Sequence, residues 1–122
     1  MARIAAVDDE REWLELYAEG LADAGHEVET FSDGRDAVKA IAADPPDLVI
    51  LDIRMGPSGR EVLKWIRQAN QALPVVMSSA YGGYREDHDF ATANAFVEKS
   101  PDLKELVATV KAILDSAGAR QS

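Results

Sequence analysis

Acidic, hydroxyl and ammonium side chains come directly after four short apolar runs in this chain of 122 residues. They are Asp8, Asp9 and Glu10 after residues 4–7, Asp52 after residues 48–51, Ser78 and Ser79 after residues 75–77, and Glu98 and Lys99 after residues 95–97. Two carboxylates about 4 Å apart repel each other by roughly 4 kcal/mol at an effective dielectric constant of 20. A cluster of such groups therefore requires a bound cation or a retained proton. Because the cluster offers oxygen ligands, it favours Mg²⁺ or Mn²⁺ over zinc.

Asp52 has the chemistry of a nucleophile as well as that of a metal ligand. A carboxylate can attack phosphorus and form an aspartyl phosphate, and a metal ion neutralises the charge that develops on the phosphoryl oxygens. Lys99 offers a second positive charge, and Ser79 offers a hydroxyl donor. Each residue also has a simpler explanation: Asp8 and Asp9 as helix caps, Lys99 as a surface lysine, and Ser79 as a turn residue. Their joint placement at strand ends favours a phosphoryl site over these explanations.

Short apolar runs alternate with amphipathic segments along the chain, which is the pattern of an α/β protein. The expected strands are residues 4–7, 28–31, 48–51, 75–77 and 95–97, and the expected helices lie around residues 14–21, 37–42, 62–66, 84–94 and 103–114. The helix over 84–94 is weak and polar. Three of the strands are apolar at nearly every position, as in a parallel sheet with helices on both faces. We therefore predict a doubly wound, five-stranded parallel sheet that binds ligands beyond the carboxyl ends of its strands.

The composition excludes several other classes of protein. Asp and Glu number 22 against 13 Lys and Arg, a net charge of −9, so direct binding to nucleic acid or to an anionic membrane is unfavourable. The chain has no cysteine, which excludes disulfides and zinc–thiolate sites. No apolar run approaches the roughly 20 residues that span a bilayer. We expect a cytoplasmic protein with one domain over residues 1–116 and a loose tail over residues 117–122.

Four motifs carry a resemblance to a known family. They are Val7-Asp8-Asp9-Glu10, residues 47–55 (DLVILDIRM), residues 74–80 (PVVMSSA) and residues 95–99 (AFVEK). In order, spacing and strand placement, residues 3–115 resemble the receiver domain of bacterial two-component response regulators. The resemblance implies a flavodoxin-like (βα)₅ fold with strand order 2-1-3-4-5.

The same resemblance implies roles for the acidic residues at the strand ends. Asp52 is expected to be the phosphoacceptor and to complete the metal site. Asp9 is expected to bind Mg²⁺ directly, and Asp8 to act partly through water. Arg54 is expected to offer its backbone carbonyl to the metal.

Three further residues are expected to respond to phosphorylation. The resemblance implies that Ser79 turns toward the phosphoryl group and that Lys99 bridges to one of its oxygens. Phe96 stands at the position of a switch aromatic residue, which rotates inward when the serine moves. As a phenylalanine it has no hydroxyl to leave unsatisfied, so we expect it to favour burial.

The implied function is phosphorelay signalling rather than catalysis on a released substrate. The expected phosphoryl donor is a histidine kinase or a histidine phosphotransfer protein. The expected output is a protein partner or a homodimer through the fourth helix, fifth strand and fifth helix. Large side chains at Arg54 and Tyr81 predict slow loss of the phosphoryl group. Two alternatives remain: a Mg²⁺-dependent phosphohydrolase of the haloacid-dehalogenase type, and a receiver fold that binds partners without phosphorylation.

The sequence departs from the family pattern at two places near the site. Met55-Gly56-Pro57 stands where Met-Pro is usual. Ser100 follows Lys99 where the family usually has a proline after a cis bond, and a cis bond before a residue other than proline costs about 2.5–4 kcal/mol.

Overall fold

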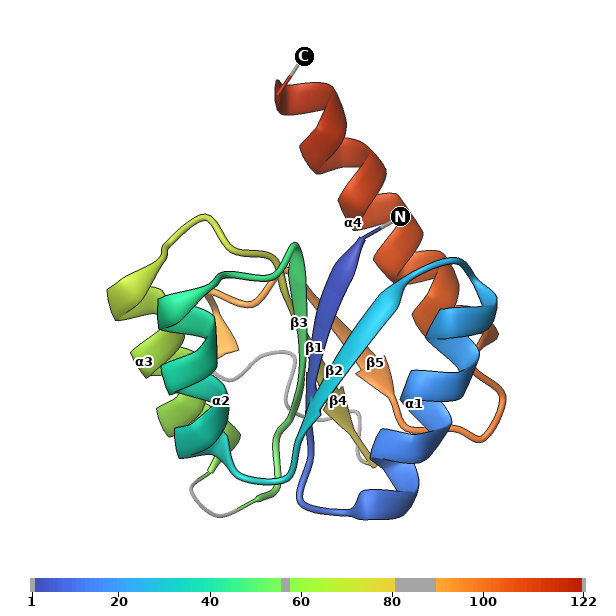
Figure 1. The fold of residues 1–122 in the computed structure, drawn as a ribbon, viewed down its shortest axis with the longest axis horizontal. Coiled ribbons are helices and arrows are strands. Elements are labelled where there is room, and N and C mark those ends of the chain that lie inside the picture. Colours follow the sequence, from blue (N-terminus) through green and yellow to red (C-terminus); the bar gives the residue numbers. More distant parts are fainter. Residues whose placement is uncertain (1, 56–57, 81–89, 122) are drawn as a thin grey trace.

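The structure is a computed structural model that describes residues 2–55, 58–80 and 90–121 of the chain. Five parallel strands form one sheet in the order β2-β1-β3-β4-β5, with helices on both faces (Figure 1). The elements are β1 (Arg3–Val7), α1 (Arg11–Asp23), β2 (Glu27–Phe31), α2 (Gly34–Ala43), β3 (Leu48–Asp52), α3 (Gly59–Ala69), β4 (Val75–Ser79), β5 (Ala95–Glu98) and α4 (Lys104–Gln121). The sheet and its strand order confirm the doubly wound, flavodoxin-like fold expected from the sequence.

Side chains of the strands alternate between two apolar layers, one on each face of the sheet. Ala5 of β1 packs in the layer covered by α2 and α3. Ile4 and Ala6 pack in the opposite layer, covered by α1 and α4 (Figure 1). All five positions of β3 are buried. This explains the unbroken apolar run over residues 48–51, because neither face of a central parallel strand meets water.

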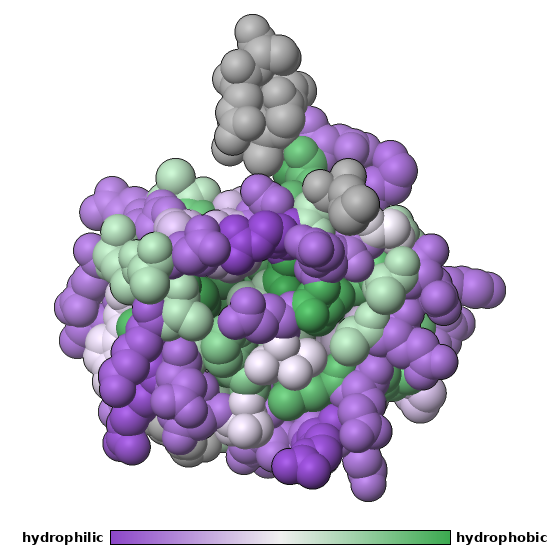
Figure 2. Space-filling model, in the orientation of Figure 1, coloured by the Kyte–Doolittle hydropathy of each residue, from purple (hydrophilic) through white to green (hydrophobic). Residues whose placement is uncertain are grey.

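A groove of about 600 Å³ lies beside the edge strand β2. Figure 2 shows this face of the molecule, with apolar side chains exposed between charged ones. Phe31, Ala40 and Ile41 line the groove together with Glu27 and Glu29. None of the site residues expected from the sequence lines it, so the groove is not the candidate site.

The described residues just before β5 differ from the end of the fourth helix expected over residues 84–94. Phe90 has 3₁₀ geometry, and residues 91–94 form a turn that leads into β5. Asn94 is bound to the start of β4: its N–H donates to Val75 O at 2.8 Å, and its side-chain oxygen accepts from Val75 N at 2.9 Å. These bonds hold the backbone extended for entry into β5, so the helix prediction is wrong over residues 91–94. Residues 84–89 lie outside the described residues.

The last helix, α4, continues through Gln121. It therefore crosses the boundary expected after residue 116, and the division into a domain over 1–116 and a tail over 117–122 stays a prediction. Within residues 2–55, 58–80 and 90–121, no helix combines the length and the apolar character needed to span a bilayer.

Gly59, the first residue of α3, touches the backbone that leaves β3. A Cβ at this position would press against Asp52 O and lie 2.8 Å from Ile53 Cα. We expect Gly59→Ala to lower the free energy of unfolding by about 1–3 kcal/mol, the usual cost of overpacking, as measured by urea denaturation. Gly20→Ala on α1 is the matched control, because its Cβ meets the flexible end of the Leu103 side chain and alanine favours a helix. Equal losses in the two variants would contradict the prediction.

Candidate functional site

The carboxyl ends of β1, β3, β4 and β5 lie side by side, and Asp8, Asp52 and Lys99 meet there. Lys99, just after β5, lies at their centre. Its Nζ is 2.9 Å from Asp8 Oδ2, 3.4 Å from Asp52 Oδ1 and 3.6 Å from Glu10 Oε1. Asp8 is 0% exposed and Asp52 is 2% exposed. The site therefore surrounds one ammonium group with two buried carboxylates from separate strands.

Each buried carboxylate is oriented by the backbone two residues further along the chain. Asp8 Oδ1 accepts a hydrogen bond of 2.9 Å from Glu10 N, and Asp52 Oδ1 accepts one of 3.3 Å from Arg54 N. Both are local turns in which an Asp side chain bonds to the following backbone. Because these turns use Oδ1, the other carboxylate oxygen of each residue, Oδ2, makes no backbone hydrogen bond in the turn and can face the site.

The alternative in which Asp8 and Asp9 cap the first helix is not supported. The N-cap residue of α1 is Glu10, and its side chain makes no capping hydrogen bond. Asp8 Oδ1 bonds to the N–H of Glu10 itself, rather than to an N–H in the first turn of the helix. The placement of these acidic residues therefore needs another explanation.

Burial and charge act in opposite directions on the ionisable groups of the site. Burial, followed by the negative charge of Asp8, raises the pKa of Asp52 from 3.8 to about 6, against the opposing effect of Lys99. Burial lowers the pKa of Lys99, but its contacts with Asp8 and Asp52 outweigh burial and raise that pKa. At neutral pH the site therefore holds a mostly ionised carboxylate beside an ammonium group.

The remaining oxygens suit a hard divalent cation. Asp52 Oδ2 is buried and accepts no hydrogen bond from the described residues. Asp8 Oδ2 is also buried, and its contact is the ion pair with Lys99 at 2.9 Å. Carboxylate oxygens of Asp8, Asp9 and Glu10 lie within 4.8 Å of one another. Mg²⁺ binds oxygen ligands of this kind and usually keeps several waters. The donor set fits the expected cofactor, and Glu10 is a further candidate ligand because its carboxylate belongs to this cluster.

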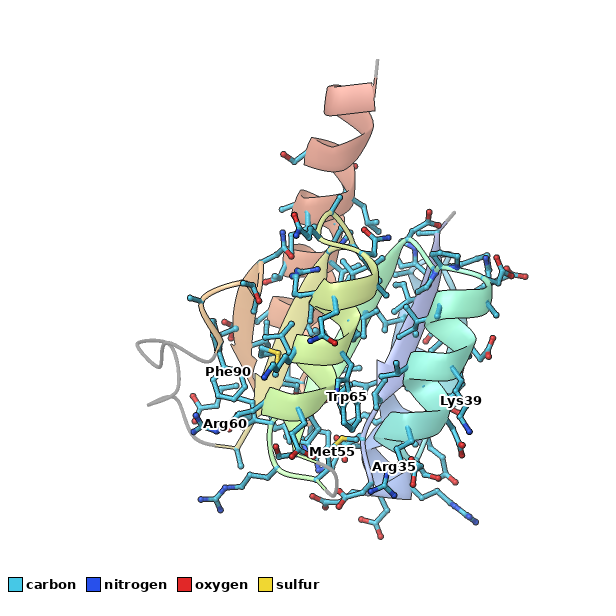
Figure 3. All side chains as sticks on the ribbon, turned by 90° about the vertical axis from the view of Figure 1, so that its left-hand side faces the viewer. Arg35, Lys39, Met55, Arg60, Trp65 and Phe90 are labelled. Atoms are coloured by element: carbon cyan, nitrogen blue, oxygen red, sulfur yellow. The ribbon has the colours of Figure 1, made fainter. Side chains whose placement is uncertain are left out.

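Ser79 and Phe96, the expected switch residues, lie on the neighbouring strands β4 and β5. Ser79 is buried, whereas Phe96 is half-buried. Phe96 packs edge-on against Phe90, with ring centroids 6.2 Å apart at 85°. The Arg60 guanidinium carbon lies 4.9 Å from the centroid of the Phe90 ring (Figure 3). Phe90 is completely buried. The sequence pattern assigned it to a weak, polar helix, and only its large aromatic side chain indicated that it would be buried.

Tyr17 and Ser78 form a buried polar pair beside the acidic site. Their hydroxyl oxygens are 2.7 Å apart and hydrogen-bonded. Ser78 is the register partner of Asp52 on the adjacent strand, so the pair lies next to the candidate phosphoacceptor. Burial raises the pKa of Tyr17 to about 12, which keeps its hydroxyl protonated. The sequence pattern indicated Tyr17 only as part of an apolar helix stripe, because its partner lies 61 residues away.

Tyr17→Phe is expected to lower the free energy of unfolding by about 1–2 kcal/mol, since a buried hydroxyl without a partner is costly. Ser78→Ala is expected to cost a similar amount for the same reason. The double variant is expected to be less destabilised than the sum of the single variants, with a coupling energy of about 1 kcal/mol. Urea denaturation of the wild type, both single variants and the double variant measures this cycle. Strictly additive losses would show that the hydroxyl pair contributes nothing.

The sequence matches known signalling proteins over most of its length. Residues 4–111 match the model of the response regulator receiver domain. The chain is 36% identical over 115 residues to the response regulator MprA of Mycolicibacterium vanbaalenii. It is 33% identical over 120 residues to the alkaline phosphatase synthesis transcriptional regulatory protein PhoP of Bacillus subtilis. Both matches cover 92% of this chain but 50% and 48% of the relatives, so the chain spans about half the length of these curated proteins.

Solved structures resemble the whole fold. The response regulator protein TrrA of Thermotoga maritima, in complex with Mg²⁺ and BeF, matches with a TM-score of 0.88 and 40% identity, over 92% of this chain and 98% of that chain. The structure of the histidine kinase ThkA in complex with TrrA matches with a TM-score of 0.87 and 39% identity, over 93% of this chain and 99% of that chain. The chain therefore belongs to the response regulator receiver domain family of two-component signalling.

Proposed function

We propose that this chain accepts a phosphoryl group from a phosphohistidine onto Asp52, with Mg²⁺, and changes conformation to signal to a protein partner. One observation carries the proposal: Asp52 is buried at a strand end, its Oδ2 accepts no hydrogen bond from the described residues, and Lys99 lies 3.4 Å from its Oδ1. A nucleophile, a set of metal ligands and a cation at one site are what the formation of an acyl phosphate requires.

In the proposed transfer, a carboxylate oxygen of Asp52 attacks phosphorus. The new P–O bond forms as the P–N bond to the donor imidazole breaks. The electron pair of the broken bond stays on the imidazole nitrogen, which takes up a proton. Lys99 balances the charge of a phosphoryl oxygen, and Ser79 donates a hydrogen bond to the phosphoryl group. The raised pKa of Asp52, about 6, still leaves this carboxylate mostly ionised and nucleophilic at neutral pH.

The proposed Mg²⁺ ligands are the carboxylates of Asp8, Asp9 and Asp52 and the backbone carbonyl of Arg54, with Glu10 as a further candidate. Bound there, the ion supplies charge neutralisation for the phosphoryl oxygens. The proximity of the carboxylate oxygens of Asp8, Asp9 and Glu10 supports this assignment. So does the similarity to TrrA, which was solved with Mg²⁺ and BeF.

The proposed phosphoryl donor is a histidine kinase or a histidine phosphotransfer protein in the cytoplasm. The complex of TrrA with the histidine kinase ThkA supports this class of partner. The proposed output is a protein partner or a second copy that contacts the face formed by the expected fourth helix, β5 and the last helix, α4. Residues 84–89 of that expected fourth helix lie outside the described residues. The chain is proposed to catalyse only its own phosphorylation and a slow dephosphorylation. Arg54, which is exposed two places after Asp52, is proposed to slow the dephosphorylation by shielding the phosphoryl group from water. Tyr81, the second expected shield, lies outside the described residues.

The test is incubation with Mg²⁺ and acetyl phosphate, followed by mass spectrometry. We expect one added phosphoryl group per chain, mapped to Asp52 and lost on treatment with hydroxylamine. Asp52→Asn should not be modified, and no modification should occur with a chelator. Asp44→Asn is the matched control, because Asp44 is an exposed carboxylate that pairs with Arg3 at the start of β1. Continuous release of phosphate from small phosphoesters would indicate a phosphohydrolase instead, and an unmodified wild type would overturn the proposal.

A further inference from the structure

The Lys99 ammonium contacts both the carboxylates of the site and the ring of Trp13. Its Nζ is 5.1 Å from the centroid of the Trp13 ring, within the range of a cation–π contact. The lysine side chain is only 6% exposed, so this contact is partly shielded from water. Trp13 is half-buried on the first turn of α1.

Tyr17 supports the Trp13 ring from the next turn of the same helix. The two ring centroids are 5.9 Å apart with a tilt of 36°. The Tyr17 hydroxyl is anchored in turn to Ser78 of β4. A ring held in this way presents its face to Lys99 without the loss of rotamer freedom that a mobile side chain would incur on binding.

A divalent cation at the acidic cluster would compete with Lys99 for the same oxygen. The ammonium is 2.9 Å from Asp8 Oδ2, a buried oxygen that is also a candidate ligand of the metal. Like charges repel, so a bound cation would weaken the hold of Asp8 on the ammonium. The face of Trp13, 5.1 Å from the ammonium, is a second attractive surface already within reach.

We infer that Trp13 is a positioning residue, which holds the Lys99 ammonium at the site while a divalent cation occupies the carboxylates, so that the ammonium remains in place for the phosphoryl group. This inference rests on the proposed function. It predicts that Trp13 raises the affinity for ligands that contact Lys99, such as a phosphoryl analogue, and does not raise the affinity for the cation alone. A residue that only packs against its neighbours would make no such distinction.

The test compares Mg²⁺ binding with binding of beryllofluoride in the presence of saturating Mg²⁺, by titration calorimetry. Trp13→Leu is expected to raise the beryllofluoride dissociation constant about two- to fivefold, the equivalent of one partly exposed cation–π contact. The dissociation constant for Mg²⁺ is expected to stay the same or to fall. Trp13→Phe keeps an aromatic face and is expected to restore most of the beryllofluoride affinity. Trp65→Leu removes the other tryptophan, half-buried on α3, and is expected to change neither constant.

A second readout follows the tryptophan itself. In a Trp65→Phe background, the fluorescence of Trp13 is expected to change when Mg²⁺ is added, because the Lys99 ammonium stays at the site but shifts its contact from Asp8 toward the Trp13 ring. The further substitution Lys99→Met should abolish that change. If Trp13→Leu behaves like Trp13→Phe in beryllofluoride binding, or if the emission change survives without Lys99, the inference is wrong. A wild type that binds Mg²⁺ but no beryllofluoride would overturn the proposed function, and the inference with it.

Discussion

Asp52→Asn is expected to raise the free energy of unfolding of the metal-free protein at neutral pH by about 2–3 kcal/mol, while abolishing phosphorylation. Burial and the charge of Asp8 raise the pKa of Asp52 from 3.8 to about 6, and each pKa unit corresponds to about 1.4 kcal/mol. The ionised carboxylate of Asp52 therefore lowers the free energy of unfolding of the metal-free protein. Asparagine has a similar shape without the charge.

The pH dependence of this difference follows from the direction of the shift. Because the pKa of Asp52 is higher in the folded than in the unfolded state, the folded protein binds more protons between pH of about 4 and 6. The stability contributed by this group therefore falls as pH rises through that window, and the penalty is complete above the folded pKa. Urea denaturation with a chelator should show wild type and Asp52→Asn converging near pH 4 and diverging toward pH 7. A difference that does not vary with pH would contradict this account.

Lys99→Met is expected to destabilise the metal-free protein by about 3 kcal/mol at neutral pH, because it removes one partner of a buried ion pair and leaves the other unpaired. The Lys99 side chain is 6% exposed, and the side chains of Asp8 and Asp52 are 0% and 3% exposed. Mg²⁺ should recover part of the loss by supplying a replacement cation. Thermal and urea denaturation with and without Mg²⁺ measure both effects.

Two controls make the Lys99→Met result specific. Lys111→Met removes an exposed lysine that pairs with Asp115 at 2.7 Å, and it should leave stability unchanged, because exposed ion pairs contribute little. The double variant Lys99→Met/Asp52→Asn should be more stable than Lys99→Met, since it also removes one of the unpaired charges. If Lys99→Met is as stable as Lys111→Met, the ammonium does not balance the carboxylates as the geometry indicates.

Most of the framework could be predicted from the sequence, because its physical causes are local. An apolar run such as residues 48–51 has to be buried on both faces, and this requires a parallel sheet covered by helices. Parallel strands end at one edge of the sheet, so Asp8, Asp52 and Lys99 had to approach one another. The prediction failed over residues 91–94, where the hydrogen bonds between Asn94 and the start of β4 outweigh a weak helical pattern.

The sequence by itself thus determined the order of the strands, the edge at which the charged groups gather and the family to which the chain belongs. Only the tertiary structure decided which side chains contact one another around the site. The Tyr17 hydroxyl bonds to Ser78, the Trp13 ring lies beside Lys99, and the Phe90 ring contacts both Arg60 and Phe96. The physical reason is that periodicity reports which face of an element is buried, but not which side chain it meets there. Those contacts depend on how the helices and the loop segments pack against the sheet, which involves residues far apart in the chain.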